Sequence, residues 1–265
     1  MASVSKYLLS LFLLVLGLAI SGAQADALDD ITKRGTLRVG VSLFTPWTIQ
    51  NEEGKLAGFD VDVARKIADD MGLKVELKVY PWEDIMPALN KGEIDLIAAG
   101  MAITPSRALK VAFSQPYSES GVTLATHTAN TKNINSLTEL NKKEITITAV
   151  KDSIGGDLAA SVFDKATLTL FEKPEQAEKA VLEGKAHGYV ASSPMANILA
   201  LTHPEVVDLP LPEALLSYKI GFAVRKNEQS LLNFLNAWIV SRTADRWLPA
   251  SANFWFESLE WQEAQ

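Results

Sequence analysis

The chain has 265 residues, of which 48% are hydrophobic and 22% charged, a composition typical of a folded globular protein rather than a disordered one. Its formal net charge of −7 at pH 7 argues against nucleic acid as a partner. The absence of cysteine excludes disulfides, a thiol nucleophile and thiolate metal ligands.

The first 25 residues have the pattern of a secretory signal peptide. Lys6 precedes an uncharged, mainly apolar run over residues 7–20, and Ala23 and Ala25 form a small-x-small cleavage site. The run is shorter than the roughly 20 residues that a transmembrane helix needs. We therefore expect cleavage after Ala25 and export of a soluble protein, which in a two-membrane bacterium means the periplasm.

The first part of the chain alternates strands and helices. A short helix ends near Gly35, and a loop with two aromatic residues, Phe44 and Trp47, follows the first strand. Asp60 is a candidate cap for the next helix. Strands are predicted over 36–41, 73–79 and 94–98, with helices over 61–71 and 82–90. This βαβαβ order indicates a mainly parallel sheet that is covered on both faces.

A second α/β unit follows. A crossing strand over 121–126 leads into a polar linker over 130–141, and a strand over 220–224 returns to the first unit. Between them we predict strands over 145–150, 167–170 and 187–190, and helices over 155–163, 174–182 and 193–201. Helices over 228–242 and 244–248 precede an aromatic tail with Trp255, Phe256 and Trp261. Two such units joined by two strand crossings create a cleft.

The segment after the strand at 94–98 predicts an anion site. Ala99 and Gly100 are small and leave room for a ligand, while Thr104 and Pro105 begin a helix. Arg107 lies in the first turn of that helix. A guanidinium beside a helix N-terminus combines forked donors, free N–H groups and a favourable dipole, which suit a small carboxylate.

Four motifs resemble the bacterial extracellular solute-binding proteins of family 3, which serve polar amino acid ABC transporters. They are GFDVDVA at 58–64, GEIDLI at 92–97, ITPSR at 103–107 and FSQPY at 113–117. The resemblance covers essentially the whole mature chain. It implies an α/β, two-lobed periplasmic binding protein-like fold of type II, with the second lobe inserted into the first and a cleft and hinge between them.

This resemblance sets the expected domain limits. Residues 1–25 form the signal peptide, residues 26–120 plus 221–265 form lobe 1, and residues 121–220 form lobe 2.

The resemblance also implies ligand contacts. Arg107 matches the arginine that holds the α-carboxylate, Phe44 and also Trp47 match the loop that places a ring over the ligand, and Trp82 occupies another pocket-lining position. Without the family pattern, Arg107 reads as a surface arginine and the three aromatic residues as ordinary core residues.

In the second lobe, Ser153 and Ile154 match a turn whose donors complete the carboxylate site, although Asp152 stands where glycine is usual.

Two departures concern the rest of the ligand. Ala102 replaces a Ser or Thr whose hydroxyl reaches the ligand, and Ser192 replaces an Asp that grips the α-ammonium. An ammonium buried there would lose water without gaining a counter-charge, at a cost of several kcal/mol. We therefore expect a carboxylate whose amine is not required. Ser192 also has a simpler interpretation, as a cap of the helix that follows.

Lys219, at the start of the returning strand, is a candidate second positive charge for the ligand. The alternative is a solvated charge at the strand end.

The leading interpretation is a non-catalytic, monomeric protein that captures a small carboxylate-bearing solute, an amino acid or related organic acid, and presents it to a membrane ABC permease. The alternative is a periplasmic enzyme on the same fold, such as a cyclohexadienyl dehydratase-like lyase, whose general acid is not evident near Lys219 or Glu213. A sensor domain is a third reading. We expect no cofactor and no metal, since His127, His187 and His203 lack ligand spacing.

Overall fold

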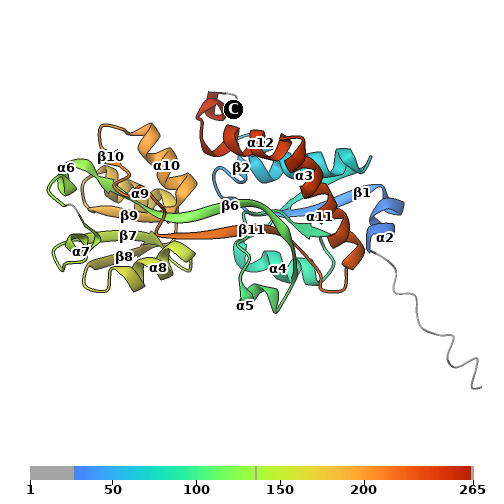
Figure 1. Cartoon of the computed structure of the whole chain (residues 1–265), viewed down its shortest axis with the longest axis horizontal. Coiled ribbons are helices and arrows are strands. Elements are labelled where there is room, and N and C mark those ends of the chain that lie inside the picture. The colour runs from blue at the N-terminus through green and yellow to red at the C-terminus, as the bar shows by residue number, and fades with distance from the viewer. Residues whose placement is uncertain (1–26, 135, 264–265) are drawn as a thin grey trace, which may run out of the picture.

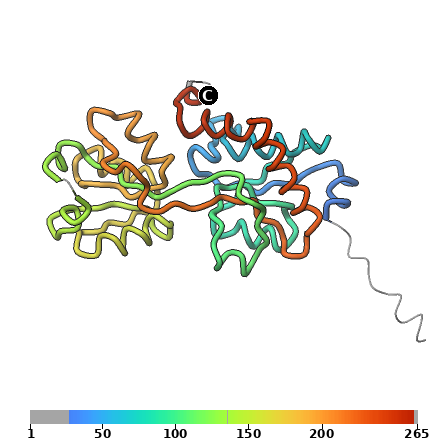
Figure 2. The backbone as a smooth tube through the Cα atoms, viewed as in Figure 1, coloured from blue at the N-terminus to red at the C-terminus, as the bar shows by residue number. Residues whose placement is uncertain are grey.

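The computed structural model describes residues 27–134 and 136–263, so the predicted signal peptide at 1–25 lies outside the described residues. Two α/β lobes lie side by side and are joined by two long strands, β6 (Ala112–His127) and β11 (Leu216–Val224) (Figure 1). The backbone trace in Figure 2 follows the same two segments from one lobe into the other. In the part of the chain that is described, none of the helices combines the length and apolarity needed to cross a membrane.

One sheet runs through both lobes, in the order β4-β1-β5-β11-β6-β9-β7-β8, with β10 (Val207–Asp208) paired to β6. The first lobe pairs β1 in parallel with both β4 and β5, as the βαβαβ order predicts. These strands span Thr36–Val41, Lys74–Val79 and Leu96–Ile97. A separate two-stranded sheet joins β2 (Ile49–Gln50) to β3 (Leu56–Ala57).

The second lobe repeats the parallel arrangement. Strand β7 pairs in parallel with β8 and β9, and β9 pairs antiparallel with β6. The three strands span Thr146–Val150, Thr167–Phe171 and Gly188–Ser192. The expected lobe boundaries at 120/121 and 220/221 fall inside β6 and β11, and they stay a prediction.

Helices cover both faces of each lobe. In the first lobe they are α2 (Ala27–Arg34), α3 (Phe59–Asp70), α4 (Trp82–Asn90), α5 (Pro105–Ala108), α11 (Gln229–Ala244), α12 (Trp247–Phe256) and α13 (Glu260–Glu263). In the second lobe they are α6 (Thr128–Thr131), α7 (Leu137–Leu140), α8 (Ile154–Val162), α9 (Pro174–Leu182) and α10 (Ser193–Thr202). Separate apolar clusters form on the α8 face and on the α9 and α10 face of the second lobe, so its sheet is buried on both sides.

The C-terminal aromatic residues are helical rather than a tail. Helix α12 extends to Phe256, whose ring centroid lies 4.6 Å from that of Trp47 and 4.9 Å from that of Phe59. Trp255 donates from Nε1 to Asp62 at 2.9 Å. Burial of these rings against distant parts of the chain stabilises the helix beyond the predicted end at residue 248. The prediction missed this because local sequence carries no signal for a partner so distant in the chain.

The helix that we expected Asp60 to cap begins at Phe59, and its N-cap is Gly58, which makes no side-chain cap. Asp60 lies within the first turn and is fully buried. The capping prediction is wrong, because this carboxylate has two tertiary partners that are described below.

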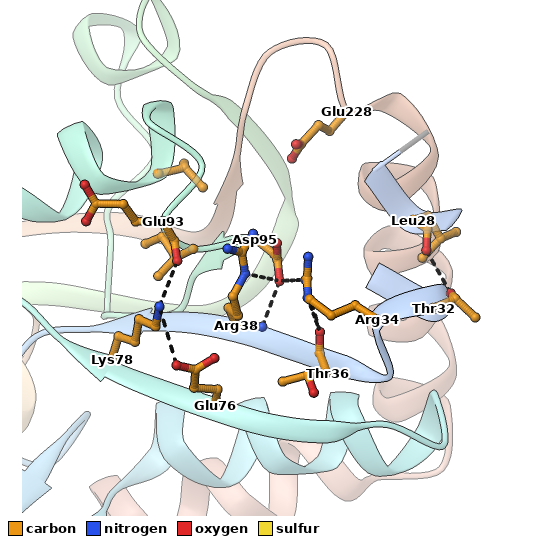
Figure 3. A network of polar contacts seen from close by, with 12 residues as sticks. Leu28, Thr32, Arg34, Thr36, Arg38, Glu76, Lys78, Glu93, Asp95 and Glu228 are labelled. Carbon is orange, nitrogen blue, oxygen red and sulfur yellow. Dashed lines mark hydrogen bonds and ion pairs between the residues drawn. The ribbon is translucent and has the colours of Figure 1, made fainter. Parts of the chain in front are cut away.

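The motif residue Asp95 has a structural role at the edge where the parallel strands begin. Figure 3 shows its carboxylate between two arginines: Arg38 donates to Oδ1 at 2.7 Å and Arg34 to Oδ2 at 2.5 Å. The Asp95 side chain is 2% exposed. Loops that follow strands β1 and β5 lie at the opposite edge, where open α/β sheets bind their ligands.

Candidate functional site

The chain leaves β5 through Gly100, which has φ 58. A Cβ at this position would lie 3.0 Å from the Trp47 ring, so both the backbone angle and the close packing favour glycine. The Gly100 amide donates to Asp60 Oδ2 at 2.6 Å. The predicted small residue therefore fits a tightly packed turn.

The next residues attach to the crossing strand. Ile103 donates its backbone N–H to the Lys219 carbonyl at 2.8 Å, and Gly221 donates to the Met101 carbonyl at 3.2 Å. These bonds hold the segment before α5 against β11. The candidate anchor therefore lies beside a strand that links the two lobes.

Arg107 projects from a helix start of the predicted kind. Thr104 is the N-cap and accepts from the Arg107 amide at 3.3 Å, with Pro105 in the first turn. The guanidinium donates to the Ala102 carbonyl at 3.0 Å, and its Cζ lies 5.1 Å from the centroid of the Trp82 ring. Among the described residues Arg107 forms no ion pair, and burial lowers its pKa. Its remaining donors suit an anion.

Tyr218 is a neighbour of Arg107 that the sequence analysis did not identify. Burial raises the pKa of this half-buried hydroxyl, and the nearby guanidinium charge of Arg107 opposes that rise. The residue precedes Lys219 on β11, and successive side chains of a strand point to opposite faces. The sequence thus pointed to the neighbouring residue, Lys219, but did not show which side of the strand faces Arg107.

The position of Lys219 argues against the expected role as a second positive charge for the ligand. Its side chain is 60% exposed and forms an ion pair with Glu119, directly opposite it on β6. The alternative, a solvated charge on the strand, describes this residue.

Two predicted residues lie where the lobes meet. Phe44 packs against the core of the first lobe and against the apolar cluster around Tyr189 in the second lobe. Ile154, at the start of α8, packs against the first-lobe core and against the second-lobe cluster around Val122. Both side chains therefore border the space between the lobes.

Three other predicted residues direct their side chains into the core. Trp47 is 1% exposed, Ala99 2% and Ala102 1%. The Trp47 ring meets Phe59 edge to face at a centroid distance of 5.6 Å. This burial argues against a ligand contact by these side chains, since the aromatic cluster and the strand packing already use them. Trp82, in contrast, is 37% exposed.

The second-lobe turn is shaped by its own hydrogen bonds. Ser153 Oγ donates to the Val150 carbonyl at 2.7 Å and accepts from the Gly156 amide at 3.0 Å, so it caps α8. Asp152 has φ 55, a conformation that explains why glycine is usual there. A Cβ on Gly156 would lie 2.5 Å from the Val150 carbonyl oxygen, so this glycine serves close packing.

Ser192 occupies the N-cap position of α10 but makes no side-chain cap, so that prediction is wrong. Its Oγ is buried and has no hydrogen-bond partner among the described residues. Ser120 Oγ on β6 is in the same situation. A buried hydroxyl without a partner is costly, so each requires an explanation.

A groove elsewhere on the first lobe and the distribution of possible metal ligands add no predicted residue to the candidate site. A groove of about 360 Å³ between α3 and α12 is lined by residues such as Arg65 and Trp247, none of which was predicted to bind. Within residues 27–134 and 136–263, no group of three histidine or acidic side chains is placed to hold a metal ion.

The chain is similar to a family model, to individual proteins and to a solved structure. The model of the bacterial extracellular solute-binding proteins, family 3, matches residues 37–258. The L-cystine-binding protein TcyJ of Escherichia coli is 26% identical over 252 residues, which cover 92% of this chain and 91% of TcyJ. Cyclohexadienyl dehydratase of Pseudomonas aeruginosa is 26% identical over 185 residues, 69% of each chain.

A solved structure from Wolinella succinogenes, described as a binding component of an ABC transporter complexed with lysine, is also similar. It has a TM-score of 0.80 and 29% identity, and the match covers 87% of this chain and 99% of the other.

Proposed function

Because this chain belongs to family 3 of the bacterial extracellular solute-binding proteins, we propose that it is the periplasmic substrate-binding component of an ABC transporter and captures a small carboxylate-bearing solute. The solute is an amino acid or a related organic acid, bound between the two lobes and presented to a membrane permease. The monomer binds and releases this solute without chemistry.

The observation that carries this proposal is the unpaired guanidinium of Arg107. It is partly buried, has one backbone partner, the Ala102 carbonyl, and stacks over Trp82 beside a strand that links the lobes. A desolvated guanidinium without a carboxylate partner gains most from a ligand that supplies one, since forked donors match the two carboxylate oxygens.

Residues from both lobes complete the proposed site. Phe44 borders the interlobe space from the first lobe and Ile154 from the second. The amides of Ile154 and Gly155 at the start of α8 precede the amide that Ser153 caps, and they suit the same carboxylate. Closure of the lobes would bring these donors together with Arg107, as in a hinged trap.

Ser192 is the reason to propose that the site for a ligand amine differs from the family pattern. Where the family pattern has an acid, this chain places a buried hydroxyl with no partner among the described residues. A hydroxyl supplies no counter-charge to an ammonium, so we propose that an amine is not required for binding.

The second candidate function is a dehydratase-like lyase, which is favoured by the similarity to cyclohexadienyl dehydratase. Such chemistry needs an acid near the ligand. Glu119, the acidic residue of β6, is exposed and paired with Lys219, and Glu213 is exposed.

A thermal-shift screen with organic acids and amino acids tests the proposal, with mass spectrometry of each mixture after incubation. We expect saturable stabilisation by at least one carboxylate and an unchanged ligand mass. Product formation would favour the enzyme, and absence of stabilisation by every carboxylate would contradict the binding function.

A further inference from the structure

Three hydroxyl-bearing residues share one face of the neighbouring strands β11, β6 and β9. Ser120 on β6 lies opposite Tyr218 on β11, and Val122 on β6 lies opposite Ser192 on β9. Opposite residues of antiparallel strands point to the same face, as do residues two apart on one strand. Ser120, Ser192 and Tyr218 therefore project to the same side of the sheet.

The packing agrees with this register. Val122 and Val190, two residues before Ser192, both belong to the apolar cluster beneath α8, and Tyr218 packs against that cluster. Tyr218 also packs against the first-lobe core. The shared face is thus the α8 side of the sheet, at the place where the lobes meet.

Two of the three hydroxyls on this face lack a hydrogen-bond partner in the part of the chain that the structure describes. Ser120 Oγ and Ser192 Oγ are buried, and neither has a hydrogen-bond partner among the described residues. Ser120 lies beside the Tyr218 hydroxyl and lowers its pKa, so the two side chains belong to one polar group. Unsatisfied buried hydroxyls of this kind are stabilised by a polar group that enters the site.

A positive charge acts on the Tyr218 end of this face. Arg107 lies near Tyr218, whereas Glu119 alternates to the opposite face and pairs there with Lys219. An ammonium beside Arg107 would meet a like charge and no carboxylate on these strands. An uncharged oxygen would instead match the hydroxyls, which both donate and accept.

From this juxtaposition we propose that Ser120, Ser192 and Tyr218 form a neutral polar subsite, which selects carboxylates that carry an uncharged hydroxyl or carbonyl oxygen near the acid group over the corresponding α-amino acids. This inference rests on the proposed function, since it assumes that Arg107 binds the carboxylate. It adds the class of solute, namely hydroxy acids and keto acids.

Calorimetry with matched pairs tests the inference: lactate against alanine, malate against aspartate, and 2-hydroxyglutarate or 2-oxoglutarate against glutamate. We expect the hydroxy or keto member to bind about tenfold or more tightly than the amino member in every pair that binds.

Three substitutions assign that preference to the subsite. Ser120→Ala and Tyr218→Phe each weaken binding of the hydroxy or keto acid by about three- to tenfold, the usual effect of one neutral hydrogen bond. Ser192→Asp moves the preference toward the amino member. Ser217→Ala is the matched control, since Ser217 is exposed and points to the other face of β11; it leaves both affinities unchanged.

The outcomes separate the two proposals. Tighter binding of the amino members by the unsubstituted protein, or equal behaviour of Ser120→Ala, Tyr218→Phe and Ser217→Ala, overturns the neutral subsite and leaves the binding function intact. Failure of every carboxylate to bind at millimolar concentration overturns both.

Discussion

Tyr117 donates its hydroxyl to Asp60 Oδ1 at 2.6 Å, although the two residues are 57 positions apart. The second oxygen of the same carboxylate accepts from the Gly100 amide. Asp60 therefore joins α3, the crossing strand β6 and the turn that leads to Arg107. The Tyr117 ring stacks on Phe222 of β11 at a centroid distance of 4.0 Å, so the contact reaches both strands of the hinge.

The stability of the protein is expected to fall with rising pH because of Asp60. Burial raises the pKa of this carboxyl from 3.8 to about 7, against the opposing effect of its two hydrogen bonds. The folded protein then binds the proton more tightly than the unfolded chain, so the contribution is fully present below pH 3.8 and is lost as the pH rises toward about 7.

Urea unfolding across this range measures the effect, with Asp60→Asn as the comparison. The variant cannot ionise at this position and should show a flatter profile than the unsubstituted protein, by up to about 4 kcal/mol between the ends of the range. Parallel profiles would mean that Asp60 does not titrate there.

Arg107→Ala is expected to weaken carboxylate binding by about 2 to 5 kcal/mol, because it removes the charged partner of a desolvated group. Arg107→Lys keeps the charge but loses the fork, so its affinity should lie between the two. Calorimetry with a carboxylate found in the screen gives the dissociation constants, and equal values for all three proteins would remove Arg107 from the site.

Gly100→Ala is expected to destabilise the fold by about 2 kcal/mol or more and also to weaken binding. Part of the loss is the left-handed backbone, which costs about 1 to 2 kcal/mol for a residue with a Cβ, and the rest is the contact with Trp47. Gly72→Ala is the matched control, since Gly72 has φ 68 and open space around its Cβ position. If both variants unfold at the same urea concentration, the packing argument fails.

Asp95→Ala is expected to destabilise the protein by about 3 kcal/mol, because it leaves Arg34 and Arg38 without their shared buried partner. The cluster lies at the strand edge opposite the proposed site, so the dissociation constant for the carboxylate should stay the same under conditions where the variant is folded. A large loss of affinity in the folded variant would show that the two edges are coupled.

Lys219→Ala is expected to change the free energy of unfolding by less than about 1 kcal/mol, since exposed ion pairs contribute little. It should not weaken carboxylate binding. A marked loss of affinity by calorimetry would restore the ligand role that the sequence alone suggested for Lys219.

Local patterns predicted many of the regular elements and the helix start at Arg107. The strand at Thr36–Val41 and the helices at Trp82–Asn90 and Pro174–Leu182 have the predicted bounds, because short-range periodicity and turn residues determine them. Thr104 likewise caps the turn that carries Arg107, and Pro105 begins it. These signals lie within a few residues of the element that they specify.

The sequence could not predict which side of an element faces which partner. Trp47 is buried under Phe256 and Asp60 is bound to Tyr117, two contacts between residues far apart in the chain. Ser192 has the residue type and position of a cap, but the path of the chain into α10 leaves its hydroxyl without that bond.

The sequence by itself determined the family, the order of strands and helices and the arginine beside a helix N-terminus, because each depends on residues close together in the chain. Only the tertiary structure decided that Tyr218 rather than Lys219 lies near that arginine, and that Ser120 and Ser192 share its face. The physical reason is strand geometry: a shift of one residue in register turns a side chain to the opposite face, and register is set by pairing with a distant strand.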